Sequence, residues 1–138
     1  MNITEAINAI VEQWYAERED TFRNSDEITI DNIRYHINCG LCEELAETII
    51  RSGEFEGAEG FWGDNFDAEF WGIDVEGWVE YAAYHYFILY KGRYYDSEAS
   101  EGVDHPKDLP LYQKNLIYAT TGQIWDWKNE KFYAKVAG

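Results

Sequence analysis

The sequence predicts a single α+β domain over residues 1–138, with N-terminal helices packed on a small antiparallel sheet. Two observations predict this class. Apolar residues recur at helical spacing in the N-terminal third, whereas aromatic-rich runs typical of strands follow residue 80. A length of 138 residues with 46% hydrophobic residues also suits one packed core. An acidic, aromatic-rich insert at about 53–80 separates the two halves.

The helical half is predicted to contain two amphipathic helices. The first covers residues 3–23 and ends at the break Asn24-Ser25-Asp26. Residues 27–37 fit neither the helical nor the strand period. The second helix covers residues 40–52, and Gly53 stands where a C-terminal glycine cap belongs.

The second half is predicted to form an antiparallel sheet. Residues 81–90 and 93–99 read as two strands joined by a tight turn at Lys91-Gly92. Further strands are predicted at 116–119, 123–127 and 131–136, with Lys128-Asn129-Glu130 as the last turn.

The charge of the chain is strongly negative and unevenly distributed. With 27 Asp and Glu against 11 Lys and Arg, the net charge is −16, and −9 of it lies within residues 53–80. The sequence predicts no direct binding to DNA or RNA, because affinity for nucleic acids comes from clustered Lys and Arg. The partner expected for such a surface is basic. The candidate binding residues are Glu54, Glu56, Asp64, Asp67 and Glu69.

The composition predicts a cytoplasmic protein without disulfides, metal or cofactor. Two cysteines do not form a disulfide framework, and with His36 they lack the spacing of a zinc site. The acids around Asp64 lack the regular spacing of a calcium loop. No basic-plus-apolar leader opens the chain, and its longest apolar run is too short to cross a membrane.

Cys42 is the candidate nucleophile because it falls in the first turn of the second predicted helix. Backbone N–H groups and the helix dipole favour a thiolate there. Glu43 and Glu44 follow at once and oppose it by like-charge repulsion, and the sequence leaves that balance open. The alternative interpretation of Cys42 is a buried structural cysteine.

The predicted hairpin supplies a base and a residue to orient it. If Lys91-Gly92 is a two-residue turn, Phe87 pairs with Asp96. His85 shares a face with Phe87, so Asp96 is its diagonal neighbour, roughly 7–8 Å away between backbones. We therefore predict His85 as the base and Asp96 as its orienting carboxylate, the alternative being a histidine that only packs.

Acyl transfer also needs donors aimed at the oxyanion that develops on the attacked carbonyl. The backbone N–H of Cys42 is one candidate. The second is a side chain from the segment that enters the helix, with His36 preferred and Asn38 next.

Two segments resemble a known superfamily. Residues 38–46, NCGLCEELA, are similar to the C-G-x-C helix start of papain-like cysteine hydrolases, in which the second cysteine is the nucleophile. Residues 85–96, HYFILYKGRYYD, resemble the His…Asp hairpin of transglutaminase-like and peptidoglycan-amidase-like members. Residues 97–103 and 108–110 are similar to small uncharacterised proteins of phages and mobile elements. Together the resemblance covers roughly residues 33–112.

The resemblance implies a papain-like or transglutaminase-like core and a Cys-His-Asp amide or peptide hydrolase, or acyl transferase. It departs from the pattern at Glu43, where an aromatic residue is usual, and at His36, where glutamine is usual. The competing hypothesis is a non-enzymatic acidic binding protein. Such a protein, for example a phage-encoded anti-CRISPR or anti-restriction inhibitor, would mimic nucleic acid and block a basic host protein.

Overall fold

A computed structural model describes residues 1–134 and confirms the α+β class. Its elements follow one another as α1 (Ile3–Ala16), α2 (Arg18–Thr21), η1 (Ser25–Glu27), α3 (Ile33–Gly40), α4 (Cys42–Arg51), β1 (Glu59–Trp62), η2 (Gly63–Asn65), α5 (Ala68–Trp71), α6 (Trp78–Ala82), β2 (Tyr86–Tyr90), β3 (Arg93–Tyr95), η3 (Pro106–Asp108), α7 (Pro110–Thr121), β4 (Gln123–Asp126) and β5 (Lys131–Ala134).

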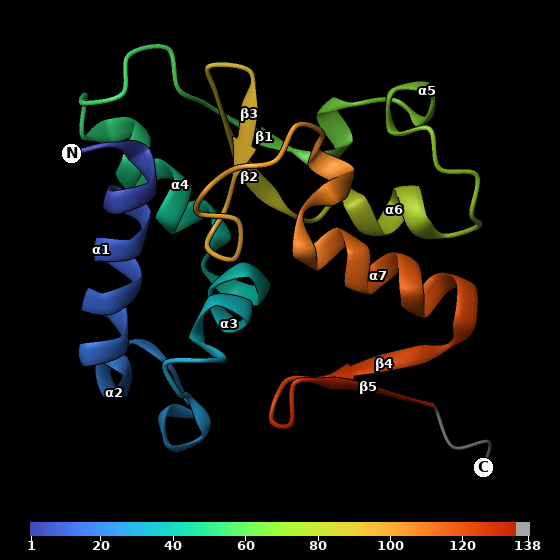
Figure 1. Cartoon of the computed structure of the whole chain (residues 1–138), viewed down its shortest axis with the longest axis horizontal. Helices are drawn as coiled ribbons and strands as arrows, with labels where there is room; N and C mark the ends of the chain where they lie inside the picture. Colours follow the sequence, from blue (N-terminus) through green and yellow to red (C-terminus); the bar gives the residue numbers. More distant parts are fainter. Residues whose placement is uncertain (135–138) are drawn as a thin grey trace.

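A three-stranded antiparallel sheet in the order β1-β2-β3 stands between two groups of helices (Figure 1). On one side α4 packs on β2, and α1 and α3 pack on α4. On the other side lie α5, α6 and α7 (Figure 1). The β4–β5 hairpin forms a second sheet next to α7. The N-terminal helices therefore cover a small antiparallel sheet, as the sequence predicts.

The central strand β2 belongs to two hydrophobic cores at once. Ile88 packs with the buried residues of α1, α3 and α4, while Phe87 packs with Trp71, Trp78 and Tyr112. Both strand residues are fully buried. Successive side chains of a strand point to opposite faces, so one strand can serve both cores. The sheet is consequently covered on both faces.

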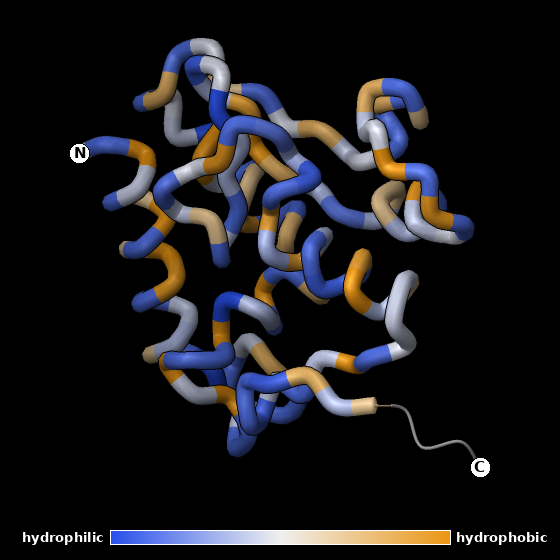
Figure 2. Tube along the Cα trace, turned by 45° about the vertical axis from the view of Figure 1, so that its right-hand side comes forward, coloured by the Kyte–Doolittle hydropathy of each residue, from blue (hydrophilic) through white to orange (hydrophobic). Residues whose placement is uncertain are grey.

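The helical predictions are confirmed in kind and corrected at their ends. The helix predicted over 40–52 is α4, and Gly53 follows it with φ of +74°, the left-handed conformation of a C-terminal cap. The helix predicted over 3–23 is two helices, because the chain departs from helical angles at Glu17. Along α1 the trace alternates between hydrophobic and hydrophilic residues, as an amphipathic helix should (Figure 2).

One predicted strand begins too early and another is wrong. The strand predicted over 81–90 is β2 only from Tyr86 onward, because Tyr81 and Ala82 belong to helix α6, whose Trp78 and Ala82 lie one turn apart and are both buried. The strand predicted over 116–119 lies inside α7, which begins at Pro110 and is followed by Gly122 at φ of +75°. Short apolar runs do not distinguish a buried helix from a strand.

The C-terminal hairpin is confirmed over the residues that the structure describes. β4 pairs with β5 in antiparallel register, and the turn between them contains Glu130 at φ of +52°. Asp126 Oδ1 stabilises this turn by accepting the backbone N–H groups of Lys128 and Asn129 at 3.0 and 3.3 Å. Residues 135 and 136 of the predicted strand lie outside the described part. Between residues 1 and 134, none of the helices combines the length and apolar character that crossing a membrane requires.

Candidate active site

The hairpin register places His85 and Asp96 together. Tyr90 pairs with Arg93 across the Lys91-Gly92 turn, whose two residues have φ of +50° and +78°. This is the two-residue turn that the sequence predicts. His85 Nε2 and Asp96 Oδ2 are 2.9 Å apart, and each side chain is only 2% exposed.

Asp96 is held rigidly because its second oxygen is also occupied. Asp96 Oδ1 accepts the backbone N–H groups of Glu98 at 3.0 Å and Ala99 at 2.7 Å. These bonds turn the chain, so β3 ends at Tyr95 and the strand predicted to reach residue 99 is shorter. The carboxylate therefore meets the imidazole in one fixed orientation.

The backbone of His85 is fixed by a glycine and a tyrosine. Gly63 donates its N–H to the carbonyl of His85 at 3.0 Å. A Cβ on Gly63 would overlap the carbonyl group of Ala82, so only glycine allows this approach. The same Ala82 carbonyl accepts the hydroxyl of Tyr112 at 2.7 Å. Tyr112 also packs edge-on against the imidazole, with ring centroids 5.4 Å apart.

Cys42 begins α4, where no side chain caps the free N–H groups of the first turn. The other ring nitrogen of His85, Nδ1, is buried and has no hydrogen-bond partner in the described structure. The Cys42 side chain is one of the groups that raise the pKa of His85, after burial, which lowers it, and Asp96, which raises it.

The charges around His85 favour its protonated form. Burial alone lowers the pKa of His85, but hydrogen bonding to Asp96 and the side chain of Cys42 outweigh it and raise the pKa to about 9. Burial also raises the pKa of Tyr112, and the nearby carboxylate of Asp96 raises it further. Cys42, His85, Asp96 and Tyr112 therefore share one electrostatic environment.

The raised pKa of His85 predicts a pH-dependent stability. The free energy of unfolding should fall as pH rises from about 6.5, the usual histidine pKa, to about 9, because the folded protein then loses the proton that it binds more tightly. The loss due to His85 is about 3 kcal/mol. Urea unfolding across this range measures it, with His85→Gln as the reference. A variant that loses stability as steeply as the wild type contradicts the prediction.

A pocket of about 200 Å³ opens beside His85 and provides access to the site. It is bounded by α3, α6 and α7, and its lining includes Asn38, Cys39, Tyr84 and Asn115. Tyr84 is 82% exposed, so it stands at the mouth. The lining contains Cys39 rather than Cys42, although Cys42 itself is partly exposed.

Cys39 differs from Cys42 in its surroundings. Cys39 is exposed as a residue, yet burial of its thiol raises the pKa of that thiol. The nearby carboxylate of Glu98 raises the pKa of Cys39 further. No disulfide joins the two cysteines. Cys39 is accordingly the less ionised thiol expected for a structural cysteine.

The two residues predicted to assist the oxyanion lie in different places. His36 packs edge-on against Trp127, with ring centroids 4.4 Å apart, and also against Phe22. Burial lowers its pKa, and its Nε2 lacks a hydrogen-bond partner within residues 1–134. Asn38, by contrast, lines the pocket next to His85. The role predicted for His36 stays a prediction that no contact supports.

A polar network behind the pocket was not expected from the sequence. Asn38 Nδ2 donates to Glu98 Oε1 at 2.9 Å, and Asn38 Oδ1 lies 2.7 Å from the hydroxyl of Ser97. Lys114 forms an ion pair with Glu98 at 2.6 Å, with both side chains largely buried. Arg34 donates to the carbonyl of Ser97 at 2.6 Å. The network joins α3 and α7 to the loop that carries Asp96, and no short sequence motif signals contacts over such separations.

The acidic residues of the insert are all exposed, although some of its aromatic residues are buried. All nine carboxylates between residues 53 and 80 face solvent, and the ion pairs found among residues 1–134 include none of them. The segment runs from the end of α4 across β1 to α5 and α6 (Figure 1). One predicted binding residue, Asp67, also caps α5 by accepting the N–H of Phe70 at 2.8 Å. The others are Glu54, Glu56, Asp64 and Glu69, which lie along the same exposed segment.

The described residues contain no group of three or more side chains placed to hold a metal ion. Comparison with known proteins finds no matching protein-family model, no matching curated protein and no matching solved structure. The chemistry of the site is therefore inferred from its own residues.

Proposed function

We propose that the protein is a small cysteine-dependent amide or peptide hydrolase, or acyl transferase, with Cys42 as nucleophile, His85 as proton carrier and Asp96 as orienting carboxylate. One observation carries this proposal. A buried histidine binds a fixed carboxylate through Nε2, its Nδ1 has no partner among the described residues, and the side chain of Cys42, at the start of a helix, is one of the groups that raise its pKa. A nucleophile, a base and a group that orients the base are what this chemistry needs.

In the proposed reaction the Cys42 thiolate attacks the substrate carbonyl carbon, and the electron pair of the C=O bond moves to oxygen. The C–N bond then breaks as His85 Nδ1 gives its proton to the departing amine, which leaves a thioester on Cys42. Water attacks the thioester while His85 takes a proton from it, and the C–S bond breaks to release the acid. An amine in place of water completes an acyl transfer.

The backbone N–H of Cys42 at the start of α4 is one donor for the oxyanion. We assign the second to Asn38 rather than His36. Asn38 lines the same pocket as His85, and its amide keeps one N–H beyond the bond to Glu98. His36 is engaged with Trp127 instead.

Alkylation by iodoacetamide tests the proposal without knowledge of the substrate. At pH 6, Cys42 should be alkylated faster than Cys39 and faster than N-acetylcysteine, because a thiolate paired with an imidazolium persists where an ordinary thiol is protonated. Peptide mass spectrometry reads the rate at each cysteine. Equal alkylation rates at both cysteines would contradict the assignment of Cys42 as the nucleophile. Faster alkylation of Cys39 would show that Cys42 is the wrong residue.

A second candidate function, capture of a basic protein, is favoured by the nine exposed and unpaired carboxylates of residues 53–80. Exposed charges of one sign attract an oppositely charged surface, and the attraction weakens with salt. In this reading the insert would mimic the phosphates of a nucleic acid.

The binding of an oligo-arginine peptide at several salt concentrations tests this second candidate. Replacing Glu54, Glu56, Asp64, Asp67 and Glu69 with their amides should weaken binding more than the same change at five exposed acids within residues 5–20, the region of α1 and α2. The control set is Glu5, Glu12, Glu17, Glu19 and Asp20. Equal losses in the two variants would show attraction by net charge alone and contradict a localised site.

A further inference from the structure

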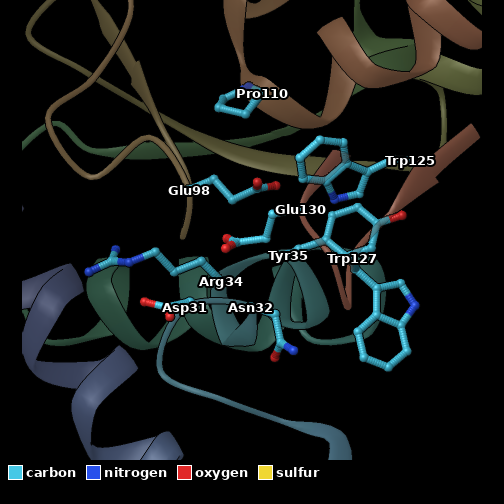
Figure 3. A pocket seen from close by; sticks show the side chains of 9 residues that line it. All are labelled: Asp31, Asn32, Arg34, Tyr35, Glu98, Pro110, Trp125, Trp127 and Glu130. Carbon is cyan, nitrogen blue, oxygen red and sulfur yellow. The ribbon is translucent and has the colours of Figure 1, made fainter. Parts of the chain in front are cut away.

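A separate pocket of about 160 Å³ opens between α3 and the β4–β5 hairpin (Figure 3). Tyr35 lines both this pocket and the one beside His85. The proposed reaction uses none of the other residues that line it, so the pocket needs an explanation of its own.

Three aromatic rings form one side of the pocket. They belong to Tyr35, Trp125 and Trp127, which lie next to one another in Figure 3. A cation of the same chain already lies against two of these rings. The ammonium of Lys114 lies 4.8 Å from the ring centre of Trp125 and 5.5 Å from that of Tyr35. Aromatic faces attract cations through their negative electrostatic potential.

Carboxylates complete the pocket opposite the rings. Figure 3 shows the carboxylates of Glu98 and Glu130 directed into the same space, with Asp31 at its edge. The Glu98 carboxylate accepts a hydrogen bond from Asn38 and forms an ion pair with Lys114, whereas Glu130 is exposed at the hairpin turn. Among residues 1–134, neither Asp31 nor Glu130 belongs to an ion pair.

The one basic residue of the lining, Arg34, does not fill this space. Its guanidinium donates to the carbonyl of Ser97 at 2.6 Å and to Asn8 Oδ1 at 2.7 Å. It points away from the aromatic rings in Figure 3. The ammonium of Lys128, which pairs with Glu27, lies 5.3 Å from the ring centre of Trp127. A cationic ligand would therefore take the place against these rings that lysines of the same chain already hold.

We propose that this pocket binds a guanidinium group, such as the end of an arginine side chain on a peptide or protein. A guanidinium is flat enough to stack on Trp125 and carries N–H donors in a fork that matches the Glu130 carboxylate. The assignment does not depend on whether Cys42 reacts, because the pocket is formed by different residues.

Titration with N-acetyl-arginine methylamide tests the proposal. We expect saturable shifts of the indole N–H signals of Trp125 and Trp127 in the NMR spectrum of isotope-labelled protein. The uncharged citrulline analogue, which has nearly the same shape, should produce no saturation. Glu130→Gln should weaken binding of the arginine derivative by about tenfold, since a charged hydrogen bond is lost. The matched control is Glu56→Gln, an exposed acid outside the pocket, which should bind like the wild type.

Several outcomes overturn the proposal. Equal binding of the citrulline analogue would show that charge is not recognised. Equal weakening by both glutamine variants would show attraction by net charge only. Tighter binding of tetramethylammonium than of the arginine derivative would assign the pocket to a quaternary ammonium group instead. Trp125→Leu provides a second check, because it should weaken binding by roughly fivefold through loss of the ring face.

Discussion

Replacing His85 with alanine is expected to slow the alkylation of Cys42 by iodoacetamide at pH 6 by about thirtyfold. An ordinary thiol is well under ~1% ionised at this pH. The proposed mechanism requires a thiolate stabilised by the neighbouring imidazolium, and the lower intrinsic nucleophilicity of such a thiolate offsets only part of the gain. Quenched-flow alkylation followed by peptide mass spectrometry gives the rate at Cys42 alone.

The matched control for this experiment is His105→Ala. His105 lies 3.1 Å from the carbonyl of Phe70 and stacks on its ring, on a different part of the surface. This control should leave the rate at Cys42 unchanged. In the wild type, the rate should stay nearly level as pH is lowered from 8 to about 6. A rate that instead falls tenfold per pH unit, as for a free thiol, would contradict the ion pair even if His85→Ala fails to fold.

Asp96→Ala is expected to lower the free energy of unfolding by about 4 kcal/mol. The change leaves a buried imidazolium at His85 without its counter-charge. It also leaves the backbone N–H groups of Glu98 and Ala99 without an acceptor, and buried donors without partners are costly. Urea unfolding monitored by tryptophan fluorescence measures the loss.

Two variants show whether this loss comes from the buried pair. Asp104→Asn removes a carboxylate that is 88% exposed and pairs with Arg93, so it should cost less than about 1 kcal/mol. Asp96→Asn keeps an oxygen that can accept the backbone N–H groups. Its loss of unfolding free energy should therefore lie between the losses of Asp96→Ala and Asp104→Asn. An alanine variant as stable as Asp104→Asn would mean that His85 and Asp96 are not coupled in the folded protein.

The part of the site that depends on local geometry was predictable from the sequence. A two-residue turn fixes the register of its hairpin, and register with alternation fixes which side chains share a face. For this reason the contact between His85 and Asp96 followed from counting residues back from Lys91-Gly92. The place of Cys42 in the first turn of its helix likewise follows from the apolar spacing, although the predicted start at residue 40 is two residues early.

The parts that depend on packing were not predictable. The sequence predicts a strand from residue 81, yet Tyr81 and Ala82 belong to α6, because Trp78 and Ala82 of this helix pack into the core beneath it. His36 precedes Cys42 closely enough to suggest a shared site, yet α3 turns it toward Trp127, more than ninety positions along the chain. Such long-range neighbours leave no local pattern in the sequence.

The two faces of strand β2 have a consequence for reactivity. Cys42 packs with the core of α1, α3 and α4, whereas the imidazole of His85 rests on Phe87 and Tyr112 from the opposite core. The proposed nucleophile and its proposed base thus belong to two separate hydrophobic cores that meet at one strand. A small shear between those cores changes the gap between sulfur and nitrogen, while each core remains packed. Conservative substitutions deep in either core, far from the thiol, should therefore tune its reaction rate.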